Sequence, residues 1–306
     1  MVGCLTQAQS LRLSNNRALA MLFASEKGDL CPEQAFDGFI HSVFNKAINI
    51  LSNDPAVSWV SLLDTSLPNT PCGVKVDIIN EPEFRQCKVN DRVYFRGGIL
   101  RFAEQPLLSI DTRMAVYWEK PPKPKEFQKS RVLKNISYAE IYFLIQANKV
   151  LNGKNIKNYI DYLNLQDIYF RFNLLYEPEK IVKNIGKGQG LTPSGDDFIC
   201  GVLALLTYLH KETECIDESF FTKVNKACKS KWKTTTEVSK NYLQQAVEGC
   251  FSQPVIWLIY DIFNSESNDE LEKSISNVLE IGSSSGCDIV SGILFGANQL
   301  KNNYIY

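Results

Sequence analysis

The sequence predicts an α+β protein, in which an N-terminal β-rich barrel or sandwich domain with one leading helix precedes a mainly α-helical C-terminal domain. Three observations predict this class. Short runs rich in Val, Ile, Tyr and Phe, separated by turn-forming residues, fill much of the first third of the chain. A charged segment with three prolines follows at residues 120–129, and beyond it apolar residues recur at helical spacing. The 306 residues suffice for two domains, each with its own core.

The first domain is expected to span residues 1–125. Its leading helix is predicted at Pro32–Ser52, where apolar residues recur every three or four positions. Strands are predicted wherever β-branched and aromatic residues form short runs between Pro, Asn, Asp and Gly. These runs are Trp59–Leu63, Gly73–Ile79, Arg92–Phe102, Leu107–Asp111 and Met114–Trp118.

The second domain is expected to span residues 126–306. A helix from about residue 138 to 151 is predicted because Ser137 and Glu140 have the spacing of a capping box. The segments that follow are long enough for helices and lack sustained alternation. They are Tyr159–Tyr176, Phe198–His210, Ser219–Ser230, Thr236–Phe251, Pro254–Phe263, Leu271–Glu280 and Ile289–Lys301.

Composition excludes several classes of partner and chemistry. Thirty-three Lys and Arg balance 34 Asp and Glu, so no net field attracts nucleic acid or an anionic membrane, and we expect neither as a partner. The start lacks a basic segment followed by an apolar stretch, and the longest apolar run, Phe198–Leu209, is too short to span a bilayer. We therefore expect a cytoplasmic protein. With only His41 and His210, chemistry that needs several histidines is disfavoured.

An internal repeat lies in the helical half of the chain. The segment 194–203, SGDDFICGVL, matches the segment 285–294, SGCDIVSGIL, at an offset of 91 residues, with Ser, Gly, Asp, Gly and Leu identical. One interpretation is two helices that each begin with good capping residues. The other is a pseudo-symmetric pair of helix starts that face one site.

A glycine-rich turn precedes the first copy of this repeat. Gly186, Gly188 and Gly190 alternate, and Pro193 then fixes one dihedral angle ahead of an apolar helix. Glycine adopts conformations that other residues avoid and lets backbone amides approach a ligand. The helix that begins near Gly195 adds unpaired amides and the positive end of its dipole, which suit phosphate or carboxylate. The sequence therefore predicts an anion-binding loop.

Side chains around this turn suit the same chemistry. Thr192 and Ser194 offer hydroxyl donors, and Lys187 offers a positive charge. Asp196 and Asp197 lie in the first helical turn, where a carboxylate also stabilises a helix without any other function. Successive helical residues point about 100° apart, so if one Asp serves the helix start the other faces the loop or a neighbouring helix. Two carboxylates beside an anion site also suit Mg²⁺.

The second copy offers a similar set. Ser284, Ser285, Gly286 and Asp288 stand at another helix start and can hydrogen-bond an oxyanion, although serine runs also occur in ordinary loops. The segment 234–239, TTTEVS, can form a third wall of the site or merely cap the following helix.

Three segments carry a resemblance to a known family. GKGQGLTPSGDDFICG, TTTEVSKNYLQQAVEG and IGSSSGCDIVSGILFG resemble the signature of the AllH-like family. This bacterial family is labelled as carboxylases and includes the third subunit assigned to oxamate carbamoyltransferase in anaerobic allantoin degradation, a part of purine catabolism. The match covers most of the chain. It departs from the family pattern at residues 283–285, Ser-Ser-Ser, where a histidine-threonine-serine type of sequence is expected.

The resemblance implies a transferase that acts with partner subunits. The implied reaction is phosphorolysis of a carbamoyl compound such as oxalurate, which gives carbamoyl phosphate and oxamate. The substrates expected at the site are thus small anions: phosphate, carbamoyl phosphate, oxamate or oxalurate. Two alternatives remain, namely a non-catalytic partner or ligand-sensing subunit of a complex, and a carboxylase-like or ATP-dependent small-molecule enzyme.

Residue roles follow from combining the resemblance with the loop chemistry. Asp196, Asp197 and Asp288 are the expected catalytic carboxylates, which position a nucleophile or bind Mg²⁺, for which Asp196 and Asp197 are the expected ligands. We expect Asp197→Asn to abolish turnover and leave the melting temperature nearly unchanged. Lys187 is expected to neutralise the anion. The residues expected to bind it are Gly186, Lys187, Gly188, Gly190, Thr192, Ser194, Gly195, Ser284, Ser285 and Gly286.

Overall fold

The protein is described by a computed structural model that covers residues 20–300 except 55, 56, 58, 79–81, 152, 153 and 214. Its contacts divide the chain into two compact units, one that ends at Trp118 and one that begins at Glu119. The first unit is built on a β-sheet and the second on helices, so the predicted α+β class is confirmed. Residue 79 of a predicted strand and residue 301 of the last predicted helix lie outside the described residues.

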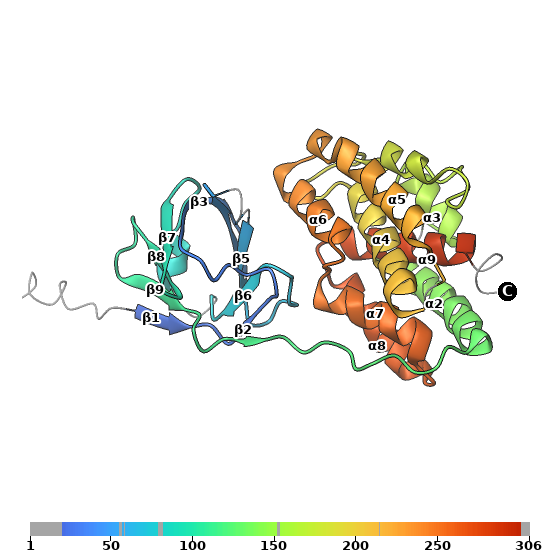
Figure 1. Ribbon diagram of the computed structural model, residues 1–306, viewed down its shortest axis with the longest axis horizontal. Helices are drawn as coiled ribbons and strands as arrows, with labels where there is room; N and C mark the ends of the chain where they lie inside the picture. Colours follow the sequence, from blue (N-terminus) through green and yellow to red (C-terminus); the bar gives the residue numbers. More distant parts are fainter. Residues whose placement is uncertain are drawn as a thin grey trace, which may run out of the picture. The chain divides into compact units, whose positions relative to one another are not determined.

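The first unit is a ten-stranded sheet within the described residues, and it curls strongly on itself (Figure 1). Neighbouring strands run in the order β1-β9-β8-β7-β3-β4-β5-β6-β2-β10, antiparallel except for the pairs β1/β9, β5/β6 and β2/β10. Every predicted strand segment contains a strand. The strands are β1 Ala20–Phe23, β2 Glu26–Lys27, β3 Phe36–Val43, β4 Ala47–Ser52, β5 Trp59–Asp64, β6 Gly73–Val76, β7 Arg92–Arg96, β8 Ile99–Phe102, β9 Leu108–Asp111 and β10 Val116–Tyr117.

The leading helix predicted at residues 32–52 is wrong. The segment is the antiparallel hairpin of β3 and β4, closed by the hydrogen bond from the amide of Phe44 to the carbonyl of Ala47. Phe36, Gly38 and Ile40 are buried at alternate positions, which is the period of a strand. A Cβ at Gly38 would lie 2.5 Å from the carbonyl oxygen of Leu51 on the paired strand. Pairing with β7 and β4 therefore outweighed the helical spacing of the apolar residues.

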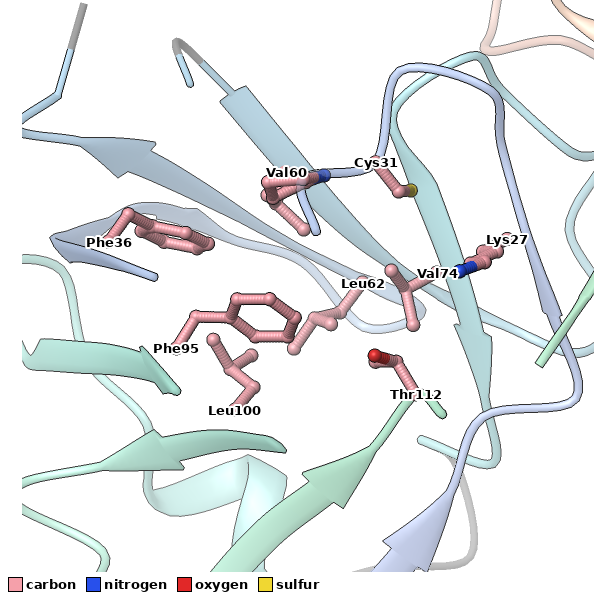
Figure 2. A pocket seen from close by; sticks show the side chains of 10 residues that line it. Lys27, Cys31, Phe36, Val60, Leu62, Val74, Phe95, Leu100 and Thr112 are labelled. Carbon is pink, nitrogen blue, oxygen red and sulfur yellow. The ribbon is translucent and has the colours of Figure 1, made fainter. Parts of the chain in front are cut away.

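The inner face of the sheet is apolar. Phe36 and Phe95 stack with ring centroids 5.4 Å apart, and Leu62, Val74 and Leu100 point into the same space (Figure 2). The cavity between them measures about 20 Å³, which is room for a single water molecule. The cavity between these side chains is therefore too small for a substrate.

The second unit begins with an extended segment and continues as helices. Each helical segment predicted for this unit contains a helix, with two differences in the bounds, and short 3-10 turns (η) lie between predicted segments. α2 begins at Lys129 and not near residue 138. Ser137 is therefore not a capping residue but lies inside the helix, where its hydroxyl donates to the carbonyl of Leu133. The predicted helix 159–176 ends at Leu165 and continues as irregular turns. The elements are α2 Lys129–Val150, α3 Tyr159–Leu165, η2 Pro178–Asn184, α4 Ser194–Glu212, α5 Glu218–Lys231, η3 Trp232–Thr234, α6 Glu237–Val247, α7 Gln253–Asn264, α8 Asn268–Leu279 and α9 Ser285–Leu300.

Helices α4 and α9 cross at the centre of this unit (Figure 1). They carry the two copies of the repeat, and their backbones meet at equivalent glycines. A Cβ at Gly201 would lie 2.0 Å from the carbonyl oxygen of Ile289, and a Cβ at Gly292 would lie 2.0 Å from that of Phe198. Gly292 lies 91 positions after Gly201, and Ile289 lies 91 positions after Phe198. Because the two contacts join equivalent residues, a local two-fold symmetry relates the helices. This close crossing brings the two helix starts together.

Gly201→Ala is expected to destabilise the protein by about 3 kcal/mol, because the new methyl group would overlap a helix carbonyl that cannot move by itself. The matched control is Gly296→Ala on α9, whose methyl group would meet only the end of the Leu205 side chain, at 2.9 Å. Urea denaturation of both variants measures the difference. Similar midpoints for the two would contradict the close crossing.

Candidate functional site at the starts of α4 and α9

The glycine-rich loop adopts backbone conformations that side chains rarely allow. Gly186, Gly188 and Gly190 have φ values of 74°, 110° and 91°, and residues 188–191 are exposed to solvent. A Cβ at Gly195, where α4 begins, would lie 2.0 Å from the carbonyl oxygen of Asn184. The first three glycines thus allow a left-handed loop at the surface, and Gly195 allows close packing where the helix begins.

The first amides of α4 are paired, which differs from the expectation that they are free. The amide of Gly195 donates to the carbonyl of Lys187 at 2.9 Å, and those of Asp196 and Asp197 donate to the carbonyl of Pro193. The amide of Gly186 is also engaged, by Asp196. The amides of residues 188–192 and 194 make no hydrogen bond to the described part of the chain. The donors that the loop offers to a ligand are therefore those amides.

Asp196 holds the loop to the next helix. Its Oδ1 accepts from the amide of Gly186 at 2.9 Å, and its Oδ2 accepts from the hydroxyls of Thr235 and Ser239, the latter at 2.7 Å. Burial raises the pKa of Asp196, and these three donors act against that rise. The side chain is 1% exposed and both oxygens are engaged. Asp196 therefore links the loop to the segment 234–239, which packs beside the loop and leads into α6.

Asp197 points the other way, towards α9. The hydroxyls of Thr192 and Ser285 lie 2.9 Å apart, and both are close enough to Asp197 to stabilise its charge. On α9, Asp288 accepts a hydrogen bond of 2.8 Å from the hydroxyl of Tyr162, and the hydroxyl of Ser194 also acts on it. Each Asp thus contacts the serine that begins the opposite helix. Pro193 is the N-cap residue of α4 and supplies no side-chain cap.

Both facing carboxyl groups are buried and incompletely paired. Asp197 is 6% exposed and Asp288 is fully buried, and the Oδ2 atom of each lacks a hydrogen-bond partner among the described residues. Burial raises the pKa of Asp197 to about 8, although Ser285 lowers it, and the charge of Asp288 raises it further. Burial likewise raises the pKa of Asp288 to about 7 against the hydrogen bonds of Tyr162 and Ser194. The site therefore holds protons near neutral pH.

The remaining expected site residues divide into two groups. The mouth of the site is its solvent-facing edge, formed by residues 188–192, Ser194, Ser284 and Ser285. Ser284 is exposed there and Ser285 is half-buried, whereas Gly286 is buried and its amide donates to the carbonyl of Ile281. The ammonium of Lys187 lies 3.4 Å from the carbonyl of Asp167 and donates to it. The hydroxyls and loop amides, rather than this cation, are thus the donors at the mouth.

The geometry does not favour the expected Mg²⁺ site. Within the residues that the structure describes, no group of three His, Cys, Asp or Glu side chains is placed to hold a metal ion. Of the two expected ligands, Asp196 already accepts three hydrogen bonds and faces away from α9. Of the three expected carboxylates, Asp197 and Asp288 each keep one oxygen without a hydrogen-bond partner among the described residues.

The sequence did not point to Tyr162. Tyr162 is 1% exposed on α3 and contacts Asp288 from 126 positions away. It lies in no motif, and a tyrosine in an apolar helix reads as a core residue, so the sequence carries no signal for it. Thr235 and Ser239, which both donate to Asp196, lie in the hydroxyl-rich segment 234–239 that the sequence offers as a wall of the site.

Two models of one family match the chain. The AllH family N-terminal domain matches residues 16–117, and the model described as oxamate carbamoyltransferase subunit AllH matches residues 184–297. The chain belongs to the AllH family. The second match contains the loop, both helix starts and the segment 234–239, whereas Tyr162 lies outside it. No solved structure matches this AllH-family chain. In its described residues, no helix combines the length and the apolar character needed to cross a membrane.

Proposed function

We propose that the chain is a subunit of an enzyme of the oxamate carbamoyltransferase type, and that the site between the starts of α4 and α9 binds its small anionic substrate. The observation that carries the proposal is the meeting of the two helix starts, where the hydroxyls of Thr192 and Ser285 lie 2.9 Å apart over two buried carboxyl groups. The family description supplies the reaction class.

Hydrogen-bond donors at the mouth of the site suit an oxyanion. The amides of residues 188–192 and 194 have no partner among the described residues, and the loop that carries them is exposed. The hydroxyls of Thr192, Ser194 and Ser285 are half-buried beside them. Successive amides in a glycine-rich turn form a concave surface that binds phosphate or carboxylate.

The carboxyl groups below the mouth suit the carbamoyl part of a substrate. A carbamoyl group presents an NH₂ donor and a carbonyl acceptor. An ionised Oδ2 of Asp197 or Asp288 accepts from the NH₂ group, and a protonated one donates to the carbonyl. A site with both kinds of partner therefore complements a carbamoyl group joined to an oxyanion, as in carbamoyl phosphate or an N-carbamoyl acid.

A thermal-shift screen of the full chain tests the proposed site. We expect phosphate, oxamate or carbamoyl phosphate at millimolar concentration to raise the melting temperature by several degrees, because a ligand at one hundred times its Kd stabilises by about 2.7 kcal/mol. Thr192→Val removes one hydroxyl at nearly constant volume and should lose the effect. Thr222→Val on the exposed surface of α5 is the matched control and should keep it.

The same screen separates the competing functions. A response to ATP with Mg²⁺ alone would favour an ATP-dependent enzyme and contradict the proposal. An equal response of wild type and Thr192→Val would place the anion elsewhere on the chain. Turnover of the isolated chain, compared with the chain assembled with its partner subunits, then distinguishes a catalytic from a ligand-sensing subunit.

A further inference from the structure

The two carboxyl groups below the mouth occupy equivalent positions of the internal repeat. Asp197 is the fourth residue of α4 and Asp288 the fourth residue of α9. Each contacts the serine that begins the opposite helix, Ser285 for Asp197 and Ser194 for Asp288. The charge of Asp288 acts on Asp197, and both charges act on Tyr162, so the glycine crossing brings the two carboxyl groups close to one another.

In this arrangement one oxygen of each carboxyl group accepts no hydrogen bond from the described residues. The Oδ2 atoms of Asp197 and Asp288 are buried without a hydrogen-bond partner among the described residues, which is costly for an ionised oxygen. The titratable groups that act on the pair are Tyr162 on α3, Asp196 and Cys200 on α4 and Cys287 on α9. None of these is a cation at neutral pH. The charge of Asp288 raises the pKa of Asp197, and a second negative charge in such surroundings disfavours the ionised form.

We propose that Asp197 and Asp288 form a coupled carboxyl pair that retains one proton and passes it from the attacking group to the leaving group of the substrate bound at this site. The inference rests on the proposed function for the identity of the substrate, but not for the existence of the pair. One member of the pair is ionised and accepts a proton while the other is protonated and donates one, so the pair serves both steps without a histidine.

The proton balance of carbamoyl transfer fits such a pair. An oxygen of hydrogen phosphate forms a bond to the carbamoyl carbon, and the bond from that carbon to the leaving amide nitrogen breaks. The ionised carboxyl takes the proton of the attacking phosphate hydroxyl, and the protonated carboxyl donates its proton to the leaving nitrogen. Carbamoyl phosphate and a primary amide result, and the pair again holds one proton. No oxidant or further reactant is needed.

Carbon-13 NMR of the full chain labelled at the aspartate carboxyl carbon tests the pair without substrate. Signals that disappear in Asp197→Asn and in Asp288→Asn identify the two groups. We expect the two groups to titrate in two separate steps, one of them near neutral pH, and each substitution to lower the midpoint of the remaining partner by at least about one pH unit. Asp261→Asn, which replaces a buried carboxyl on α7 bonded to Ser274, should leave both midpoints unchanged.

Three outcomes would overturn the pair. One is titration of both groups near the ordinary aspartate value of about 3.9. Another is that neither substitution moves the midpoint of the partner. The third is a Mg²⁺-induced shift of both signals that Asp197→Asn abolishes, which would make the two carboxyls metal ligands. Anion binding in the thermal screen together with any of these results would leave the proposed function standing and remove only the proton-sharing pair.

Discussion

Asp197→Asn and Asp288→Asn are each expected to lower kcat for carbamoyl transfer by about a hundredfold or more in the enzyme assembled with its partner subunits. Asn keeps the shape of a carboxyl group but cannot accept or release the proton, and proton transfer by a positioned side chain typically contributes that factor. KM should change much less than kcat, because the loop amides and hydroxyls that hold the anion are untouched and the Asn amide can still form hydrogen bonds with the carbamoyl group. Initial rates of carbamoyl phosphate formation measure both constants.

Asp261→Asn is the control for this experiment, since it also replaces a buried carboxyl group of the helical unit but lies on α7, outside the site. Its rate should equal that of wild type. A wild-type rate in both site variants would mean that the pair does not move protons. A proportional loss of folded protein in those variants would instead assign the carboxyls to stability, so the melting temperature of every variant is measured alongside the rate.

Stability is expected to fall as pH rises from about 4 to about 8, and Asp197→Asn should flatten this dependence. Burial holds the pKa of Asp197 at about 8 in the folded chain, whereas an unfolded aspartate has a pKa of about 3.9. Between those values the folded state binds the additional proton, so its advantage is complete below pH 4 and lost as pH rises to 8. The slope for one such group is about 1.4 kcal/mol per pH unit.

Urea denaturation of the full chain at pH 5, 6, 7 and 8 measures this slope. Asp197→Asn cannot ionise, so the variant should equal or exceed wild-type stability at pH 8, where wild type must bury a charge. Glu280→Gln, at the exposed end of α8, should keep the wild-type slope. Parallel slopes for wild type and Asp197→Asn would show that the carboxyl ionises in the fold as easily as in the unfolded chain.

Local patterns were sufficient for much of the fold. The helices from α4 to α9 lie where apolar spacing predicts them, and the strands lie where β-branched runs predict them, because each pattern reports the face that the segment buries. The hairpin of β3 and β4 was the exception. Phe36 and Ile40 satisfy both a helical and an alternating pattern, and only pairing with β7 and β5 favours the strands.

The candidate site shows the same division. Glycine spacing and the repeat pointed to the loop and to both helix starts, since a left-handed turn before a helix is a local property of sequence. The partners of the carboxyl groups could not be predicted in this way, because they come from distant parts of the chain. Asp196 and Asp197 are neighbours in sequence, yet one is engaged by Thr235 and Ser239 and the other faces Asp288.

By itself, the sequence determined that a β-rich part precedes a helical part, that a glycine-rich turn begins α4, and that α9 repeats it. Only the tertiary structure decided that Gly201 and Gly292 bring the two helix backbones into contact, that Asp197 and Asp288 face one another's serines, and that Tyr162 completes the set. The reason is physical: conformational preference acts over a few residues, whereas burial of an unpaired carboxyl depends on side chains brought together from distant parts of the chain.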